Sequence, residues 1–246
     1  MSMKAAWRSD KGRVRERNED SVAVLPEFGL VVLGDGMGGH HAGEVASQIV
    51  VESVSVSLMA AFPGLGGKVL EEAVAGANRA LFSAMDEAPG LQGMGSTVVA
   101  GAFDGQWLHY THVGDSRLYR FRHRILECLT RDHTLIQSLV DEGMFSSEQE
   151  ARGAGVSASV LTQGLGTHHD IEIGVGRGEI EPGDLYLFCS DGLSAMVDDE
   201  QIGAALEESG GDVEQAAGRL LDAALAGGGV DNISLVVVDP TGGSGA

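Results

Sequence analysis

Aspartates recur in this sequence where apolar runs meet glycine-rich turns. Four short elements are centred on Asp35, Asp115, Asp191 and Asp231. Apolar strands do not normally end on carboxylates, so their repeated placement suggests one shared task. Carboxylate oxygens are the ligands that hard divalent cations prefer. The pattern therefore predicts a site for such cations.

The spacing around these aspartates suits a common edge of a β-sheet. Asp35 and Asp191 each follow an apolar run and precede a glycine, so their carboxylates would project beyond a strand end. Gly36 has no side chain, which lets its backbone carbonyl approach a cation. Asp231 precedes an apolar run, so in an antiparallel sheet it can reach the same edge. Acids gathered there would repel one another unless cations neutralise them.

Each aspartate also has a plainer interpretation. Asp104-Gly105 separates two apolar runs and is typical of a hairpin turn with no further role. Taken singly, Asp35, Asp191 and Asp231 would also be turn residues. Asp115, between two predicted strands, could also belong to an ordinary hairpin turn, although the ligand interpretation is preferred.

The composition limits the classes of function. With 246 residues, 43% of them apolar, and no low-complexity linker, one domain over residues 1–240 is expected, followed by a flexible tail at 241–246. The net charge of −20 argues against nucleic-acid binding. No apolar run has the length of a membrane span, and no signal peptide is predicted. Cys128 and Cys189 lack metal-site spacing and are predicted to be buried free thiols, which suits the cytoplasm.

One segment departs from the acidic character of the chain. Lys11, Arg13, Arg15 and Arg17 place four of sixteen basic residues within seven positions. The cluster is a candidate anion site. Its alternation is equally compatible with the solvated edge of a strand.

The expected elements form an α+β fold. Strands are predicted near 21–25, 28–34, 96–103, 106–113, 116–121, 124–129, 184–189 and 232–238, and helices near 42–60, 70–85, 135–140, 199–208 and 212–226. Ser147 and Glu150 could form a capping box for a further short helix. Because the strands come in runs, two antiparallel sheets flanked by helices, a four-layer α-β-β-α sandwich, are expected. Residues 132–170 are interpreted as a flap over the site.

Nine motifs, in this order, resemble the bacterial form of the metal-dependent type-2C protein serine/threonine phosphatases. They are Ser9–Asp20, Gly34–His40, Gly43–Ser47, Gly95–Thr97, Gly114–Arg117, Thr130–His133, Pro182–Asp184, Cys189–Leu193 and Asp231–Ile233. Each motif alone is weak, but nine collinear motifs over nearly the whole chain are specific. The resemblance implies a single phosphatase domain that hydrolyses phosphoserine and phosphothreonine esters in proteins.

The resemblance also implies roles for individual residues. Asp35 would bridge two Mn²⁺ or Mg²⁺ ions, with the Gly36 carbonyl on one of them. The other proposed metal residues are Glu19, Asp20, Asp191 and Asp231, with Asp115 at a third, looser metal. Arg15 falls on the family's phosphate-binding arginine. His40 is the candidate proton donor to the leaving oxygen, because Met37 stands where eukaryotic relatives have a histidine.

The implied partners are phosphorylated proteins, namely a bacterial serine/threonine kinase or its substrates. Gly93–Val99 and Gly114–Tyr119 resemble the branch associated with type VI secretion kinases. A binding module that recognises phosphoproteins without turnover is the alternative from another class. A phosphatase acting on small phosphorylated molecules is a third reading of the same site.

Overall fold

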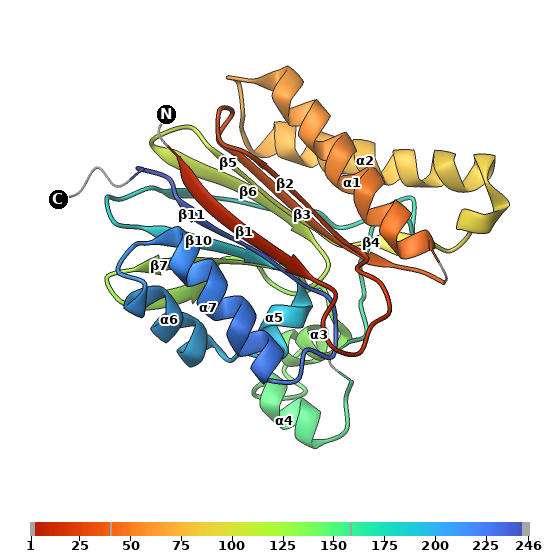
Figure 1. The fold of residues 1–246 in the computed structure, drawn as a ribbon. Helices are drawn as coiled ribbons and strands as arrows, with labels where there is room; N and C mark the ends of the chain where they lie inside the picture. The colour runs from red at the N-terminus through yellow and green to blue at the C-terminus, as the bar shows by residue number, and fades with distance from the viewer. Residues whose placement is uncertain (1–2, 40, 158, 243–246) are drawn as a thin grey trace.

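The structure, a computed structural model, describes residues 3–39, 41–157 and 159–242. Two antiparallel sheets pack face to face, and helices cover both outer faces (Figure 1). One sheet has the strand order β1-β11-β10-β7-β8, and the other follows β2-β3-β5-β6-β9 with β4 paired to β3. The predicted four-layer α-β-β-α sandwich is confirmed.

The elements have the following bounds. The first sheet contains β1 (Lys4–Asp10), β7 (Arg117–Arg122), β8 (Ile125–Cys128), β10 (Leu185–Cys189) and β11 (Ile233–Asp239). The second contains β2 (Asp20–Leu25), β3 (Leu30–Met37), β4 (Gly95–Ser96), β5 (Val98–Phe103), β6 (Trp107–Val113) and β9 (Gly174–Glu179). The helices are α1 (Ala42–Ala61), α2 (Gly67–Glu87), α3 (Leu135–Asp141), α4 (Glu148–Gly153), α5 (Asp191–Ser194), α6 (Asp199–Glu208), α7 (Val213–Ala226) and the 3₁₀ turn η1 (Pro89–Leu91).

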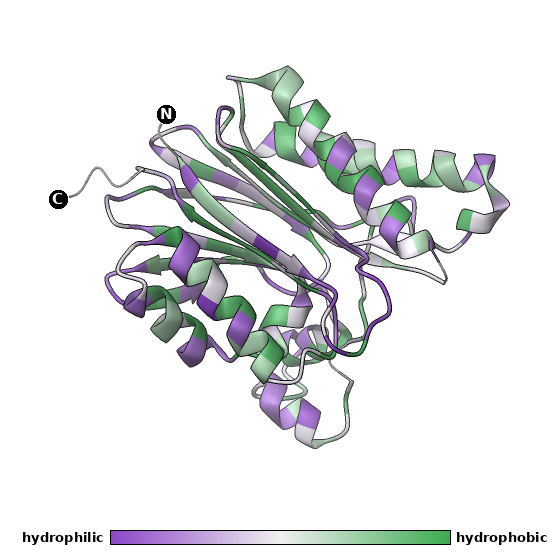
Figure 2. Ribbon diagram, in the orientation of Figure 1, coloured by the Kyte–Doolittle hydropathy of each residue, from purple (hydrophilic) through white to green (hydrophobic). Residues whose placement is uncertain are grey.

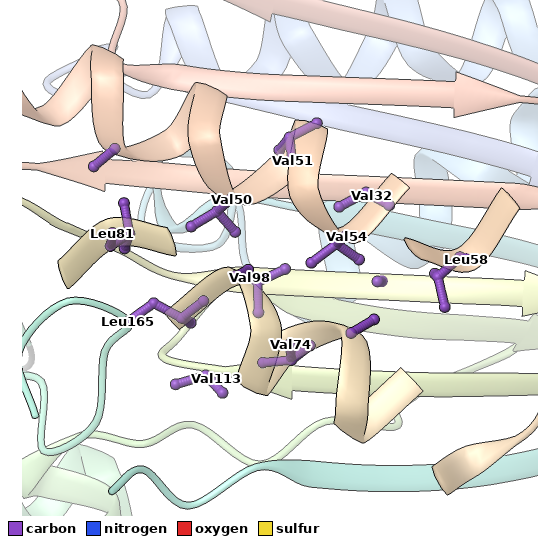
Figure 3. Packing of buried hydrophobic residues seen from close by; sticks show 14 of the residues in the cluster. Val32, Val50, Val51, Val54, Leu58, Val74, Leu81, Val98, Val113 and Leu165 are labelled. Carbon is purple, nitrogen blue, oxygen red and sulfur yellow. The ribbon is translucent and has the colours of Figure 1, made fainter. Parts of the chain in front are cut away.

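Three apolar layers hold the sandwich together. In β3, Leu30 and Val32 face the helices α1 and α2, whereas Val31 and Leu33 lie between the two sheets. Side chains alternate between the faces of a strand, and here both faces are buried, so the strand is a continuous apolar run. Figure 3 shows the outer layer, where side chains such as Val54 of α1 meet those of the sheet. A third layer joins α6 and α7 to the first sheet.

Helix α1 is long and apolar enough to cross a membrane by length and composition alone. Its buried residues, among them Val50, Val54 and Leu58, pack into the layer between the helices and the second sheet. The outward side carries polar residues such as Gln48 and Glu52, as the alternating colours in Figure 2 indicate. This arrangement is typical of an amphipathic core helix.

The antiparallel topology brings many chain segments to one end of the sandwich. Strands β1, β3, β6 and β10 end there, and β2, β7 and β11 begin there. Asp35 lies within β3 near this end, and Asp115, Asp191 and Asp231 lie in the segments that follow β6, follow β10 and precede β11. Helices α3 and α4 lie beyond this same end in Figure 1. The expectation that the acids share one sheet edge therefore has a topological basis.

The structure contradicts two of the plainer alternatives. Residues 11–17 do not form a strand edge: they make the loop between β1 and β2, which turns at Gly12 with a φ of +74°. Asp115 is not in a hairpin either, because β6 and β7 belong to different sheets. The chain crosses between the sheets at Gly114-Asp115-Ser116, so the turn there has a different geometry from an ordinary hairpin.

Other expectations are met in part. Both cysteines are free, but only Cys189 is buried, whereas Cys128 is exposed. The Ser147 hydroxyl caps α4 by accepting from the Glu150 N–H, yet the Glu150 carboxylate accepts from Ser146, so the capping box is only half formed. The predicted tail lies mostly outside the described residues, and the one-domain assignment with a flap at 132–170 stays a prediction.

Candidate active site

A pocket of about 260 Å³ lies at the end of the sandwich where the strands converge. Five acidic side chains from separate segments line it, together with Arg15 and Gly36: Glu19, Asp35, Asp115, Asp191 and Asp231. Every predicted acidic ligand except Asp20 therefore faces one cavity. The sequence separation of these residues makes their meeting a product of the fold.

Asp35 is held rigidly inside β3. Its backbone N–H donates to the Thr97 hydroxyl at 3.0 Å, and its carbonyl accepts from the Thr97 N–H at 2.9 Å. The next residue has no room for a side chain, since a Cβ on Gly36 would lie 2.0 Å from the Gly43 carbonyl oxygen. Glycine is therefore required at this position by the packing, and its backbone remains on the pocket wall.

Asp191 and Asp231 come from two neighbouring strand ends. Asp191 is the first residue of the short helix α5, directly after β10, and Asp231 lies just before β11. The two segments touch so closely that a Cβ on Gly192 would lie 1.9 Å from the Asn232 carbonyl oxygen. This close approach keeps the two carboxylates on the same side of the pocket.

Asp20 lies behind the pocket instead of lining it. It pairs with Asp35 across β2 and β3, and its Oδ2 accepts a hydrogen bond from the Ser190 hydroxyl at 2.9 Å. Its other oxygen, Oδ1, is buried without a hydrogen-bond partner in the described part of the chain. Asp20 therefore contacts the segments that carry Asp35 and Asp191 and does not line the cavity itself.

Arg15 supplies the positive charge of the pocket. One guanidinium nitrogen donates to Asp231 Oδ2 at 2.7 Å, and the side chain is 54% exposed. The hydrogen bond to Asp231, opposed by partial burial, raises the pKa of the guanidinium above its usual value. The remaining N–H groups are free to meet an anion in the pocket.

The carboxylates strongly perturb one another. Burial, then the charges of Asp20 and Asp191, raises the pKa of Asp35 well above its ordinary value. Burial raises the pKa of Asp115 to about 7, with help from the charge of Asp191. Burial also raises the pKa of Asp20 to about 7, although serine hydroxyls oppose the shift. Such crowding is unfavourable for anions without a cation among them.

The residues present fit divalent cations. All potential ligands are oxygens, and Asp20 Oδ1 and Asp191 Oδ1 are both buried without a donor in the described residues. Buried polar atoms normally have a partner, so these orphans indicate a missing one. Within residues 3–39, 41–157 and 159–242, no group of three Asp, Glu, His or Cys side chains is already arranged to coordinate a metal ion. A cation here would therefore complete its shell with backbone oxygen, water or substrate.

Several residues of the pocket escaped the sequence analysis. Ser159 and Leu161 reach it from the segment after α4, which is joined to the core by bridges such as Thr134 with Leu161. Thr97, which aligns Asp35, also lines it. The sequence singled out the motif at Gly95–Thr97, but only its hydrogen bonds show that Thr97 fixes the backbone of Asp35. Of the predicted residues, His40 lies outside the described part of the chain, and Met37 lines the pocket.

The raised pKa values give a pH prediction for the metal-free protein. Asp20 and Asp115 titrate near 7 when folded, against 3.8 when unperturbed, so the folded state binds more protons in this window. The free energy of unfolding should then fall as pH rises from about 4 to about 7. Thermal melts in EDTA should show a decreasing Tm over this range, and Mn²⁺ should restore it at the upper end. A Tm that rises with pH in EDTA would contradict the crowding of charges.

Comparison with known proteins identifies the family. Residues 11–219 match the family model described as protein phosphatase 2C. The chain is 43% identical over 239 residues to the serine/threonine protein phosphatase PstP of Mycobacterium tuberculosis, covering 96% of this chain and 45% of PstP. It is 30% identical over 244 residues to the serine/threonine phosphatase stp of Listeria monocytogenes, covering 96% of both chains. The chain belongs to the protein phosphatase 2C family, and it spans about half the length of PstP.

Solved structures agree with this assignment. A crystal structure of M. tuberculosis PstP superposes with a TM-score of 0.89 at 41% identity, covering 97% of this chain and 99% of that one. The catalytic domain of PstP in complex with two manganese ions gives 0.86 at 40% identity, covering 96% and 97%. PppA, described as a key regulatory component of the type VI secretion system in Pseudomonas aeruginosa, gives 0.81 at 33% identity, covering 97% of each chain.

Proposed function

We propose that this protein is a Mn²⁺- or Mg²⁺-dependent phosphatase that hydrolyses phosphoserine and phosphothreonine in proteins. The observation that carries the proposal is the gathering of five acidic side chains and Arg15 around one pocket, with two buried carboxylate oxygens that have no donor among the described residues. The family and the two manganese ions reported for the PstP catalytic domain support it.

Asp35, Asp191, Asp231 and the Gly36 carbonyl would hold two cations, and Asp115 would hold a third, weaker one. Bound divalent cations supply a hydroxide nucleophile at neutral pH and offset the charge of a transferring phosphoryl group. Glu19 and Asp20 would act on bound water near the cations. Asp20 keeps Asp35 aligned through the β2–β3 pairing.

Arg15 is assigned to the phosphoryl group. A planar guanidinium can donate two parallel N–H groups to phosphoryl oxygens, and Asp231 holds it at the pocket rim. His40 is assigned as proton donor to the departing serine or threonine oxygen. Because Met37 cannot carry a proton, that donor has to come from another residue or from water.

The Arg15→Ala variant tests the phosphate assignment. It should chiefly raise KM for phosphothreonine peptides and lower kcat/KM by roughly tenfold to a hundredfold, because a charge-assisted contact to the substrate is lost. The variant should still bind Mn²⁺, as measured by calorimetry.

The matched control is Arg79→Ala, an exposed arginine on α2 that has no carboxylate partner among the described residues. An unchanged kcat and KM in Arg15→Ala would remove Arg15 from the site. Equal turnover of small phosphate esters and phosphopeptides by the unaltered protein would favour a small-molecule phosphatase. Peptide binding with no turnover would favour a phosphoprotein-binding module.

The same proposal includes partners and location. Its substrates would be proteins phosphorylated by a serine/threonine kinase, including those of a type VI secretion system, as the similarity to PppA suggests. The two free cysteines are compatible with the reducing cytoplasm. Phosphoproteomics of a deletion strain would test the partners.

A further inference from the structure

The loop between β1 and β2 concentrates unpaired positive charge beside the pocket. Ten of the sixteen lysines and arginines form ion pairs with carboxylates in the described structure. The six without such a partner there are Lys4, Lys11, Arg13, Arg17, Arg79 and Arg177. Three of these six lie within seven consecutive residues of one loop, although carboxylates outnumber cations by more than two to one in the chain. Phosphate binding by Arg15 does not account for the other three.

The loop is held in place and does not move freely. The Asn232 side chain donates to the carbonyls of Lys11 at 3.0 Å and Arg17 at 2.7 Å, and it accepts from the Glu19 N–H at 2.8 Å. Gly12 fits so tightly that a Cβ would lie 2.1 Å from the Asp231 carbonyl oxygen. The loop that carries these cations therefore packs directly against the segment that carries the acidic residue Asp231.

A second pocket of about 400 Å³ opens from this loop, and we call it the flanking pocket. Its lining comprises Arg15, Glu16, Arg17, Glu19, Gly38, His41 and Asn232. Four of these, Arg15, Glu19, Gly38 and Asn232, also line the acidic pocket, so the two cavities adjoin. A peptide whose phosphorylated residue enters the acidic pocket would extend past the flanking pocket.

Arg17 is the distinctive group of the flanking pocket. Its guanidinium donates to the ring nitrogen Nδ1 of His41 and to no other side chain among the described residues, so most of its donors remain free. Two acids, Glu16 and Glu19, share the pocket, and the Glu19 carboxylate lies within range of the Arg15 and Arg17 charges, but neither acid forms an ion pair with Arg17 in the described residues. Residues 11–17 contain four cations and one acid, Glu16. Figure 2 shows this loop as largely hydrophilic, with Val14 as an exposed apolar side chain among the charges.

On the basis of the proposed function, we propose that the flanking pocket is a second anion subsite. It binds a carboxylate or phosphate group that the substrate carries next to the phosphorylated residue, and it gives the enzyme a preference for acidic phosphopeptides. Arg17 is the specificity-determining residue, and Lys11 and Arg13 add long-range attraction. The negative charge of the rest of the surface would repel such peptides. Binding them therefore requires a local group of positive charges.

The test compares three phosphothreonine peptides of equal length. One carries neutral neighbours, one carries aspartates on both sides, and one carries a second phosphothreonine. The unaltered protein should have a kcat/KM about three- to tenfold higher for the charged peptides, and the advantage should shrink with added salt. The aspartate and phosphate peptides separate the two sources of negative charge.

The Arg17→Gln variant should lose this preference, and Arg17→Glu should reverse it. The matched control Arg79→Gln removes one positive charge on α2 and should keep the preference. Equal kcat/KM for all three peptides with the unaltered protein would overturn the subsite. So would an equal loss on every peptide in Arg17→Gln, because that would mark a structural role.

The failure of the proposed function is distinguishable from the failure of the subsite. If no peptide is hydrolysed in Mn²⁺, binding of the same labelled peptides is measured by fluorescence anisotropy. Tighter binding of the charged peptides, lost in Arg17→Gln, would retain the subsite in a binding module. Equal binding of all three would overturn it.

Discussion

Replacement of Asp35 by asparagine is expected to lower Mn²⁺-dependent turnover by roughly a thousandfold or more. Asparagine keeps the shape of the side chain and its place in β3, but it removes the charge that bridging cations require. Because Asp35 is crowded by buried carboxylates, loss of its charge should also relieve repulsion in the metal-free protein. The Tm in EDTA should therefore rise by about 2–4 °C while activity is lost.

The control for this variant is Asp104→Asn in the turn between β5 and β6. There the carboxylate accepts from the Gln106 and Trp107 N–H groups, at the end of β5 opposite to the pocket residue Thr97. Despite partial burial, these hydrogen bonds lower the pKa of Asp104, so the charged form suits its site. Turnover should be unchanged in this variant. A fully active Asp35→Asn protein would rule out Asp35 as a metal bridge.

Replacement of Arg117 by alanine is expected to destabilise the fold by about 3–5 kcal/mol. Its guanidinium makes a bidentate contact with Asp132, and the two side chains are only 19% and 10% exposed. Burial disfavours its charge, but the bonds to Asp132 outweigh burial and raise the pKa of Arg117. Without the arginine, the Asp132 carboxylate, which is only 10% exposed, would lose its ion-pair partner at the start of the segment leading to α3. Urea denaturation measures the loss.

Arg120→Ala is the matched control for this effect, because Arg120 lies on the same strand. Its ion pair with Glu127 is at the surface, where Glu127 is 53% exposed, so the loss should be at most about 1 kcal/mol. The loss of stability in Arg117→Lys should fall between these two values, since lysine keeps the positive charge but lacks the planar guanidinium that bonds both carboxylate oxygens. Equal stabilities for Arg117→Ala and Arg120→Ala would show that burial does not strengthen the Arg117 pair.

The sequence predicted the buried strands well but missed two of the strands at the sheet edges. Strands such as β3 and β11 are continuous apolar runs, because both of their faces are covered. Strands β1 and β9 were missed: each lies at a sheet edge and carries polar or glycine positions. In β9, a Cβ at Gly176 would lie 2.2 Å from the ring of Tyr110. An aromatic ring on the neighbouring strand thus takes the space that an apolar side chain would fill.

The acidic residues of the candidate site could be predicted from the sequence, but the residues that hold them in position could not. Asp35, Asp191 and Asp231 stood out because carboxylates interrupt apolar patterns. The task of Asn232, which pins the β1–β2 loop through its side chain, depends on two segments more than 200 residues apart in sequence. No local pattern reports such a contact. The same applies to Asp115, whose setting follows from a crossing between two sheets.

The most direct test of the central claim is p-nitrophenyl phosphate hydrolysis by the purified protein during a titration with Mn²⁺. Turnover should rise to saturation with the metal, vanish in EDTA and be absent in the Asp35→Asn variant. This result would place metal-dependent phosphate ester hydrolysis in the acidic pocket. Turnover that persists in EDTA, or that survives in Asp35→Asn, would contradict the account.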